Sequence, residues 1–146
     1  ELPQGEIVLA NVHLKADAYK LLSPFDAATG PFATRRQEIE PVLAALEHEV
    51  RPVVIAGDMN TTDQTEVYRL VARRYVDSWR EAGVGLGHTF PAYRLRWYGL
   101  PIPPRAVRID YVWHSPQLRA VDIRRVNTGT SDHLALCAEL APSPAL

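Results

Sequence analysis

Two short runs of β-branched and apolar residues, separated by a segment of helical periodicity, constrain the fold of this chain most. The run Glu6–Leu14 reads Glu-Ile-Val-Leu-Ala-Asn-Val-His-Leu, and the run Pro52–Gly57 reads Pro-Val-Val-Ile-Ala-Gly. Both have the length and composition of buried β-strands. Between them, apolar residues recur at helical spacing, at Ile39, Val42, Leu43, Leu46 and Val50. Strands that alternate with helices favour an α/β fold.

Local signals predict where the helices begin. Thr34 followed by Gln37 has the form of a capping box and predicts a helix start at Thr34. Pro41 predicts a kink in this helix or a later start, because proline has no backbone N–H to donate. Asp63 and Glu66 form a similar pair and predict the cap of a second helix, whose apolar face would hold Val67, Leu70 and Val71.

The rest of the chain predicts one long loop and further strands. Residues 83–104 are rich in Gly, Pro and aromatic residues without a clean period, which predicts a loop, and such long loops are often functional. Three strands are expected without helices between them, so the sheet should be mixed; they span residues 107–113, 121–126 and 134–140. One domain is expected over residues 1–141, followed by a tail at 142–146.

The composition indicates an ordinary globular domain. The 146 residues suffice for one domain, and 47% hydrophobic and 23% charged residues exclude overall disorder. The formal net charge is -1, whereas a dedicated nucleic-acid binder usually has a basic excess, so any contact with nucleic acid must rest on a local patch. The single cysteine, Cys137, lies in an apolar run and is expected to be a buried thiol.

Four polar clusters stand at the ends of otherwise apolar strands. A carboxylate in such a position is costly unless it is paired, hydrogen-bonded or bound to a metal. Open α/β sheets place ligands at strand ends, so the clusters together predict one polar site shared by several strands. The clusters are Asn11-Val12-His13, Gly57-Asp58-Met59-Asn60, Arg108-Ile109-Asp110-Tyr111 and Ser131-Asp132-His133.

Each cluster also has a purely structural interpretation when it is taken alone. Asp58 and Asn60 could cap a helix and form a turn. Asp110 could pair with Arg108, and residues 131–133 could turn the chain into the last strand. His13 alone would more often be a hydrogen-bonded core histidine. One shared site explains all four clusters, in this order and spacing, better than four independent structural explanations do.

In this order the clusters resemble the second half of the endonuclease/exonuclease/phosphatase superfamily, which includes apurinic/apyrimidinic endonucleases, deoxyribonuclease I, sphingomyelinases and inositol polyphosphate phosphatases. The resemblance covers residues 6–140, and Gly87-His88-Thr89-Phe90-Pro91 looks like a segment common in bacterial members. It implies half of a four-layer α/β sandwich, with a mixed, mostly antiparallel sheet and helices packed on one face. It also implies a metal-binding Glu in an N-terminal half that is absent from this chain. We therefore expect a fragment, or a chain that pairs with the missing half and with no other stable protein partner.

The resemblance implies roles in the reaction for five of the residues. Asp58 would position or deprotonate the attacking water, and Asn60 would donate a hydrogen bond to the phosphoryl oxygens. His133 would face the phosphate, with Asp110 orienting it and keeping it protonated. His13 would be a second partner of the phosphate or of the leaving group.

The resemblance further implies a metal site and a substrate. Asp132 and Asn11 would support a divalent cation, and oxygen-rich ligands point to Mg²⁺ or Mn²⁺. The long loop would bind substrate through Arg94, Arg96, Trp97 and Arg105, with Arg108 close by.

Arginines among aromatic residues could grip phosphates and stack on bases, or face a lipid headgroup. Alternatively, this is a solvated loop whose aromatic residues pack on the core. We expect a metal-dependent phosphoesterase, with a nuclease acting on DNA or RNA ranked ahead of a phospholipid phosphodiesterase and a small phosphatase. A non-catalytic scaffold and a simple metal-binding module remain alternatives. The location would be cytoplasmic, or at a membrane through segments outside this chain.

Overall fold

A mixed four-stranded sheet forms the centre of the computed structural model, which describes residues 5–16, 30–93, 95–97 and 99–144. The strand order is β1-β2-β6-β3. β1 (Val8–His13) is parallel to β2 (Val53–Asp58), and β6 (Asp110–His114) is antiparallel both to β2 and to β3 (Val76–Asp77). The predicted α/β fold with a mixed, mostly antiparallel sheet is confirmed.

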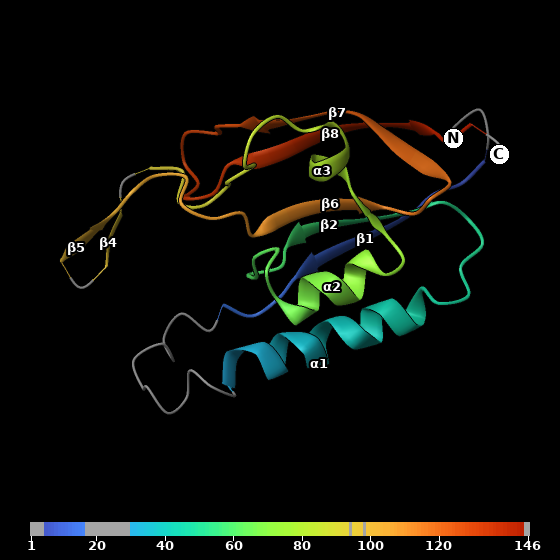
Figure 1. Ribbon diagram of the computed structural model, residues 1–146, viewed down its shortest axis with the longest axis horizontal. Helices are drawn as coiled ribbons and strands as arrows, with labels where there is room; N and C mark the ends of the chain where they lie inside the picture. The colour runs from blue at the N-terminus through green and yellow to red at the C-terminus, as the bar shows by residue number, and fades with distance from the viewer. Residues whose placement is uncertain (1–4, 17–29, 94, 98, 145–146) are drawn as a thin grey trace.

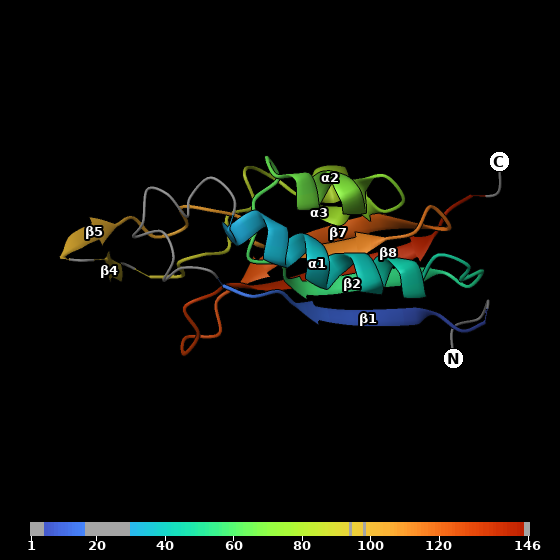
Figure 2. The same cartoon turned by 90° about the horizontal axis from the view of Figure 1, so that it is seen from below.

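Two helices cover one face of this sheet (Figures 1 and 2). They are α1 (Gly30–Ala45) and α2 (Glu66–Ala72). Alternate strand residues point toward them, because successive side chains of a strand lie on opposite faces of the sheet. The resulting core is apolar and aromatic; it includes Val12, Ile39, Val53, Ile55, Met59, Val67, Val71, Tyr111 and Trp113.

The opposite face of the sheet is partly covered by a second layer (Figure 1). This layer is the antiparallel pair β7 (Leu118–Val126) and β8 (Ala135–Pro142). The short helix α3 (Ser78–Ala82) contacts β6 and β7 on this side. The two predicted helices, α1 and α2, pack on one face as expected, whereas α3 is an additional helix that was not predicted. Both α3 and β3 are too short to leave a periodic pattern in the sequence.

The two predicted helix caps are wrong. α1 begins at Gly30, so Thr34 lies inside the helix, and Pro41 is also inside it rather than delaying its start. α1 ends at Ala45, and Val50, which was expected on its apolar face, is 85% exposed.

The cap of α2 is Thr65, whose hydroxyl accepts a hydrogen bond from the backbone N–H of Tyr68. Asp63 was the predicted cap. Its carboxylate is instead 3.1 Å from Arg80 and 3.5 Å from Arg108. Two nearby guanidinium groups therefore attract this carboxylate away from the helix end, which a local sequence pattern does not reveal.

The predicted long loop contains a hairpin, which is a correction to the sequence-based expectation. β4 (Leu95–Trp97) pairs antiparallel with β5 (Leu100–Ile102), and the pair extends away from the sheets in Figure 1. The turn between these strands uses Gly99 at φ 80°, a left-handed conformation that favours glycine.

The last strand differs from the expectation in two respects. β8 continues beyond the predicted end at residue 140, so that Ala141 pairs with Arg119, and Pro142, which was expected in the tail, pairs with Leu118. Cys137 is exposed, contrary to the predicted buried thiol, because alternate residues of β8 point away from the molecule. None of the described helices has the length and apolar character needed to cross a membrane.

Candidate active site

Three of the predicted site residues lie in one row across the sheet. His13 ends β1, Asp58 ends β2 and Asp110 begins β6; His13 is directly opposite Asp58, and Asp58 is directly opposite Asp110. Their neighbours Val12 and Tyr111 belong to the core beneath α1 and α2. Because side chains alternate, the three polar side chains lie on the other face of the sheet. The parallel pairing of β1 with β2 thus brings together polar groups 45 residues apart in the chain.

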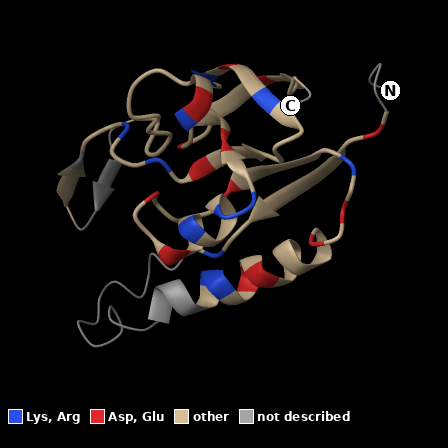
Figure 3. Cartoon of the chain, turned by 45° about the vertical axis from the view of Figure 1, so that its right-hand side comes forward, with Lys and Arg blue, Asp and Glu red and all other residues tan. Residues whose placement is uncertain are grey.

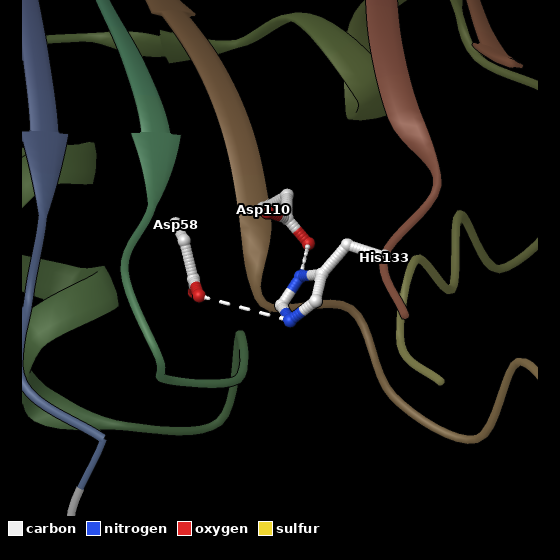
Figure 4. Close-up of side chains that lie close together, drawn as sticks. All are labelled: Asp58, Asp110 and His133. Atoms are coloured by element: carbon white, nitrogen blue, oxygen red, sulfur yellow. Dashed lines mark hydrogen bonds and ion pairs between the residues drawn. The ribbon is translucent and has the colours of Figure 1, made fainter. Parts of the chain in front are cut away.

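His133 approaches this row from the loop before β8 (Figure 4). Its Nδ1 is 2.9 Å from Oδ2 of Asp110, and its Nε2 is 3.9 Å from Oδ2 of Asp58. Asp110 therefore pairs with His133, and not with Arg108 as the structural alternative had it. The imidazole is partly buried and bridges the two carboxylates.

The segment that begins at Thr89 holds His133 in place, a role that local sequence reasoning missed. The Phe90 ring lies 4.8 Å from the imidazole, and the carbonyl of Thr89 accepts a hydrogen bond from the N–H of Leu134. The Thr89 hydroxyl also lies 3.4 Å from the N–H of Asp110. In the sequence, the only indication that this segment matters to the site was the resemblance of residues 87–91 to a segment of bacterial superfamily members.

Asn60 orients the carboxylate of Asp58. Its backbone N–H donates to Oδ1 of Asp58 at 2.7 Å, and its side-chain Nδ2 donates to Oδ2 at 3.1 Å. The same Nδ2 donates to the carbonyl of Leu14 at 2.8 Å. Both hydrogens of the amide group thus have partners, so Asn60 in this arrangement supports Asp58 instead of offering a free donor to a phosphoryl oxygen.

The electrostatic setting makes Asp58 a stronger base than an ordinary carboxylate. Burial raises the pKa of Asp58, and the nearby charge of Asp110 raises it further. The hydrogen bond from the N–H of Asn60 and the charges of His133 and His13 lower the pKa, but the raising effects prevail. The site therefore favours binding of a proton or a cation at Asp58.

The remaining predicted residues surround this group at different distances. His13 is 3.8 Å from Oδ2 of Asp58 and its side chain is 77% exposed, so it is no core histidine. Asn11 is exposed on β1 and lines a pocket of ≈ 330 Å³ together with Asp110 and His133. The side chain of Asp132 is also exposed, and its carbonyl accepts a hydrogen bond from the N–H of Ala92.

One group of side chains among the described residues has the geometry to hold a metal ion. Asp58, Asp110 and His133 each offer a ligand atom, and these atoms all lie within 4.8 Å of one another. Two carboxylates with one imidazole suit Mg²⁺ or Mn²⁺. The raised pKa of Asp58 is consistent with this fit, because a divalent cation would offset the repulsion between the carboxylates. Asp132, a predicted metal ligand, is not a member of this group, whereas Asn11, the other one, lines the pocket beside Asp110 and His133.

The predicted substrate-binding residues lie mostly outside what the structure describes. Arg94 is not among the described residues, and neither are the side chains of Arg96 and Trp97. Arg105 is described and exposed, with φ 57°. Arg108 was expected near the phosphate, but it is 6% exposed and its Nη1 lies 2.8 Å from Asp77 in a buried ion pair.

Solved structures share this fold. A functionally unknown conserved protein from Enterococcus faecalis V583 is 24% identical with a TM-score of 0.67, and the match covers 92% of this chain and 50% of that chain. An AP endonuclease from Archaeoglobus fulgidus is 21% identical with a TM-score of 0.63, covering 91% and 61%. A mannosyl-6-phosphatase from Bacteroides thetaiotaomicron is 17% identical with a TM-score of 0.58, covering 91% and 50%.

A sequence match to a protein family identifies the family of this chain. The chain spans about half the length of several of the structures it matches. No curated protein sequence matches it significantly. Residues 7–133 match the endonuclease/exonuclease/phosphatase family, whose members are phosphoesterases that include nucleases and phosphatases. Because this match covers most of the sequence and the fold agrees with it, the chain belongs to the endonuclease/exonuclease/phosphatase family.

Proposed function

We propose that this chain carries a large part of the active site of a divalent-metal-dependent phosphoesterase that hydrolyses phosphodiester bonds. The observation that supports the proposal most is the position of His133 between two carboxylates, 2.9 Å from Asp110 and 3.9 Å from Asp58. Such a group combines a base, a proton donor and a cation-binding capacity within a few ångströms. Family membership supports this proposal, because members of the family are phosphoesterases.

In the proposed reaction, Asp58 activates the nucleophile. A water molecule would attack phosphorus in line with the leaving oxygen, while Asp58 orients it or accepts its proton. The raised pKa of Asp58 suits it to this role, because the efficiency of a general base depends on how closely its pKa approaches the working pH. Asn60 keeps the carboxylate in one orientation through its two hydrogen bonds.

The two histidines would handle the charge that develops on the phosphoryl and leaving oxygens. Asp110 accepts the Nδ1 hydrogen of His133 and leaves Nε2 directed toward Asp58 and the pocket. His13 is exposed on the other side of Asp58, where it is accessible to a leaving group. In a cation-bound state, Asp58, Asp110 and the neutral imidazole of His133 would hold a divalent cation, which would supply Lewis-acid stabilisation of the phosphoryl oxygens in place of a proton from His133.

A nucleic acid is the first substrate class to test, followed by a phospholipid. The similarity to an AP endonuclease favours the first, although 21% identity carries the fold alone. Basic and acidic residues are interspersed over the described elements in Figure 3, in keeping with the net charge of -1. Affinity for a polyanion would therefore come from the site and the adjoining loop rather than from a broad basic surface.

The test is Mg²⁺-dependent hydrolysis of bis(p-nitrophenyl) phosphate by this chain and by the longest natural protein that contains it. His133→Ala should lower kcat/KM by about 10²–10⁴-fold, the usual contribution of general acid–base catalysis. His48→Ala is the matched control, because His48 is exposed after α1, and it should change kcat/KM less than about twofold. Absence of hydrolysis in the longer protein on this substrate, DNA and phospholipid would leave a binding or scaffold role.

We also propose that a further segment covers the open part of the sheet in the whole protein. Leu9 on β1 is 64% exposed and Ile7, just before this strand, is 42% exposed; β1 is an edge strand of the sheet. Apolar side chains gathered on an exposed edge strand favour contact with another part of the protein. The chain spans about half the length of the structures it matches, which leaves room for a second half of the same fold.

A further inference from the structure

Hydrogen bonds connect the loop that follows β2 to β6, on the core side of the active site. Residues 59–63 of this loop include Asn60, which orients Asp58. On one side of Asn60, the N–H of Met59 donates to the carbonyl of Ile109 at 2.9 Å. On the other side, the hydroxyl of Tyr111 donates to the carbonyl of Thr61 at 3.0 Å. Asn60 is thus held between two attachments to the same strand region.

The conformation of Asn60 requires such attachments. Its φ is 47°, in the left-handed region that residues with a Cβ rarely adopt, although asparagine tolerates it better than most. In this conformation, its backbone N–H and its side chain both reach the Asp58 carboxylate. A return to the usual negative φ would rotate the side chain of Asn60 relative to its N–H, so that the two could no longer reach the carboxylate together. The geometry of the base therefore depends on restraint of the loop.

Arg108 provides a third attachment. Its Nη2 lies 3.5 Å from Asp63, at the end of the loop, and its guanidinium stacks over the Tyr111 ring at 4.8 Å. Asp77 fixes the guanidinium from below, with contacts of 2.8 Å and 3.0 Å to Nη1. Arg108 is only 6% exposed, so its guanidinium interacts with Asp77 and Asp63 and is not accessible to a substrate.

We propose that Tyr111 and Arg108 form a positioning clamp, which holds the loop of Asn60 so that Asp58 stays aligned with Asp110 and His133. Tyr111 and Asp110 are neighbours on β6, yet they point to opposite faces of the sheet: Asp110 into the site and Tyr111 into the core beneath it. The same strand therefore presents one carboxylate of the site and holds the loop that orients the other. Neither clamp residue touches a reacting atom.

The central test is Tyr111→Phe in the longest natural protein that contains this chain. Phenylalanine keeps the ring and removes only the hydroxyl, which lies 3.0 Å from the carbonyl of Thr61 and 3.1 Å from that of Arg108. Since small misplacements of catalytic groups are costly, kcat on bis(p-nitrophenyl) phosphate should fall at least about tenfold, while KM changes less than about twofold. A purely structural role would lower stability without this selective loss of kcat in the folded fraction.

The matched control is Ser115→Ala. Ser115 is 6% exposed, and its hydroxyl oxygen accepts a hydrogen bond from the backbone N–H of Val53 at 2.9 Å. This variant also loses one buried hydrogen bond, but Val53 lies at the opposite end of β2 from Asp58. Its kcat should stay within about twofold of the parent protein. Equal losses of kcat in both variants would overturn the clamp, because they would trace the effect to core stability.

The kinetic readout rests on the proposed function, whereas a second readout does not. The backbone amide resonance of Asn60 in a ¹H–¹⁵N spectrum reports its hydrogen bond to Asp58, whether or not the protein turns over substrate. We expect this resonance to shift and to exchange faster with solvent in Tyr111→Phe, and to be unaffected in Ser115→Ala. An unchanged Asn60 resonance in Tyr111→Phe would overturn the clamp. A shifted resonance in a protein without hydrolytic activity would support the clamp and reject the proposed function.

Discussion

At the scale of single residues, Gly57 shows why the Gly-Asp-x-Asn cluster begins with glycine. Its φ of 139° is open to glycine and strained for other residues, and a Cβ built at this position would lie 1.9 Å from the carbonyl oxygen of Val12. With this backbone conformation, the carbonyl of Val12 on the paired strand leaves no room for a side chain at Gly57. This close approach lies directly beside Asp58 and helps set its position opposite His13.

Gly57→Ala is expected to lower the free energy of unfolding by more than about 2 kcal/mol, because the methyl group would force the two strands apart. Gly129→Ala is the control: Gly129 also has a positive φ, of 83°, but a Cβ there meets nothing within 4 Å. It should therefore cost only the backbone strain, about 1 kcal/mol. Urea unfolding of both variants measures the difference. Equal losses in the free energy of unfolding would show that the clash with Val12 does not contribute to the effect.

At the scale of elements, α2 illustrates how tertiary contacts select a helix cap. Asp63 and Glu66 have the spacing of a capping pair, yet Thr65 is the N-cap. The Thr65 hydroxyl lies 3.3 Å from the N–H of Tyr68 and 2.7 Å from the Thr61 hydroxyl. Because Thr61 ends the segment held by Tyr111, the start of α2 and the active-site loop share one hydrogen-bonded unit.

Thr65→Ala should destabilise the protein by about 1 kcal/mol, the usual cost of removing an N-cap side chain. Thr62→Ala is the matched control, since Thr62 takes part in this turn through its backbone carbonyl, which the substitution retains. Its effect should stay within about 0.5 kcal/mol. Thermal unfolding followed by circular dichroism at 222 nm provides the comparison. An Asp63→Ala variant that lost helix content while Thr65→Ala did not would contradict the assignment of the cap.

At the scale of the whole molecule, the layers leave one apolar region of the sheet exposed. α1 and α2 cover one face, whereas β7 and β8 cover only part of the other (Figure 1). Leu9 lies on β1 opposite Val54, and Val54 is itself only 7% exposed. Coverage of the second face therefore ends between β2 and β1. In the proposed whole protein, the additional segment would extend this coverage to Leu9.

Leu9→Lys distinguishes the isolated chain from a completed fold. In the 146-residue chain, the substitution should change the free energy of unfolding by no more than about 0.5 kcal/mol, because Leu9 is 64% exposed. In the longest natural protein that contains the chain, a segment packed on Leu9 would force burial of the new charge, and the loss should exceed about 2 kcal/mol. Urea unfolding measures both values. A small change in the longer protein would mean that Leu9 is exposed there as well.

The sequence by itself determined the elements that have strong periodicity and the polar groups at their ends. The runs around Val8–His13 and Val53–Asp58 are apolar for their full length, so their burial as strands follows from composition alone. The site residues Asp58, Asp110 and His133 were recognisable because polar residues at the ends of apolar strands need partners.

Only the tertiary structure decided which partners those groups have. The pairing of Asp110 with His133, the occupied amide of Asn60 and the committed charge of Arg108 depend on contacts between residues far apart in the chain. The exposure of Cys137 depends likewise on which face of β8 the layers cover. Local patterns specify backbone preference and the need for burial, whereas the choice among several available partners is made by the packing of strands and loops in space.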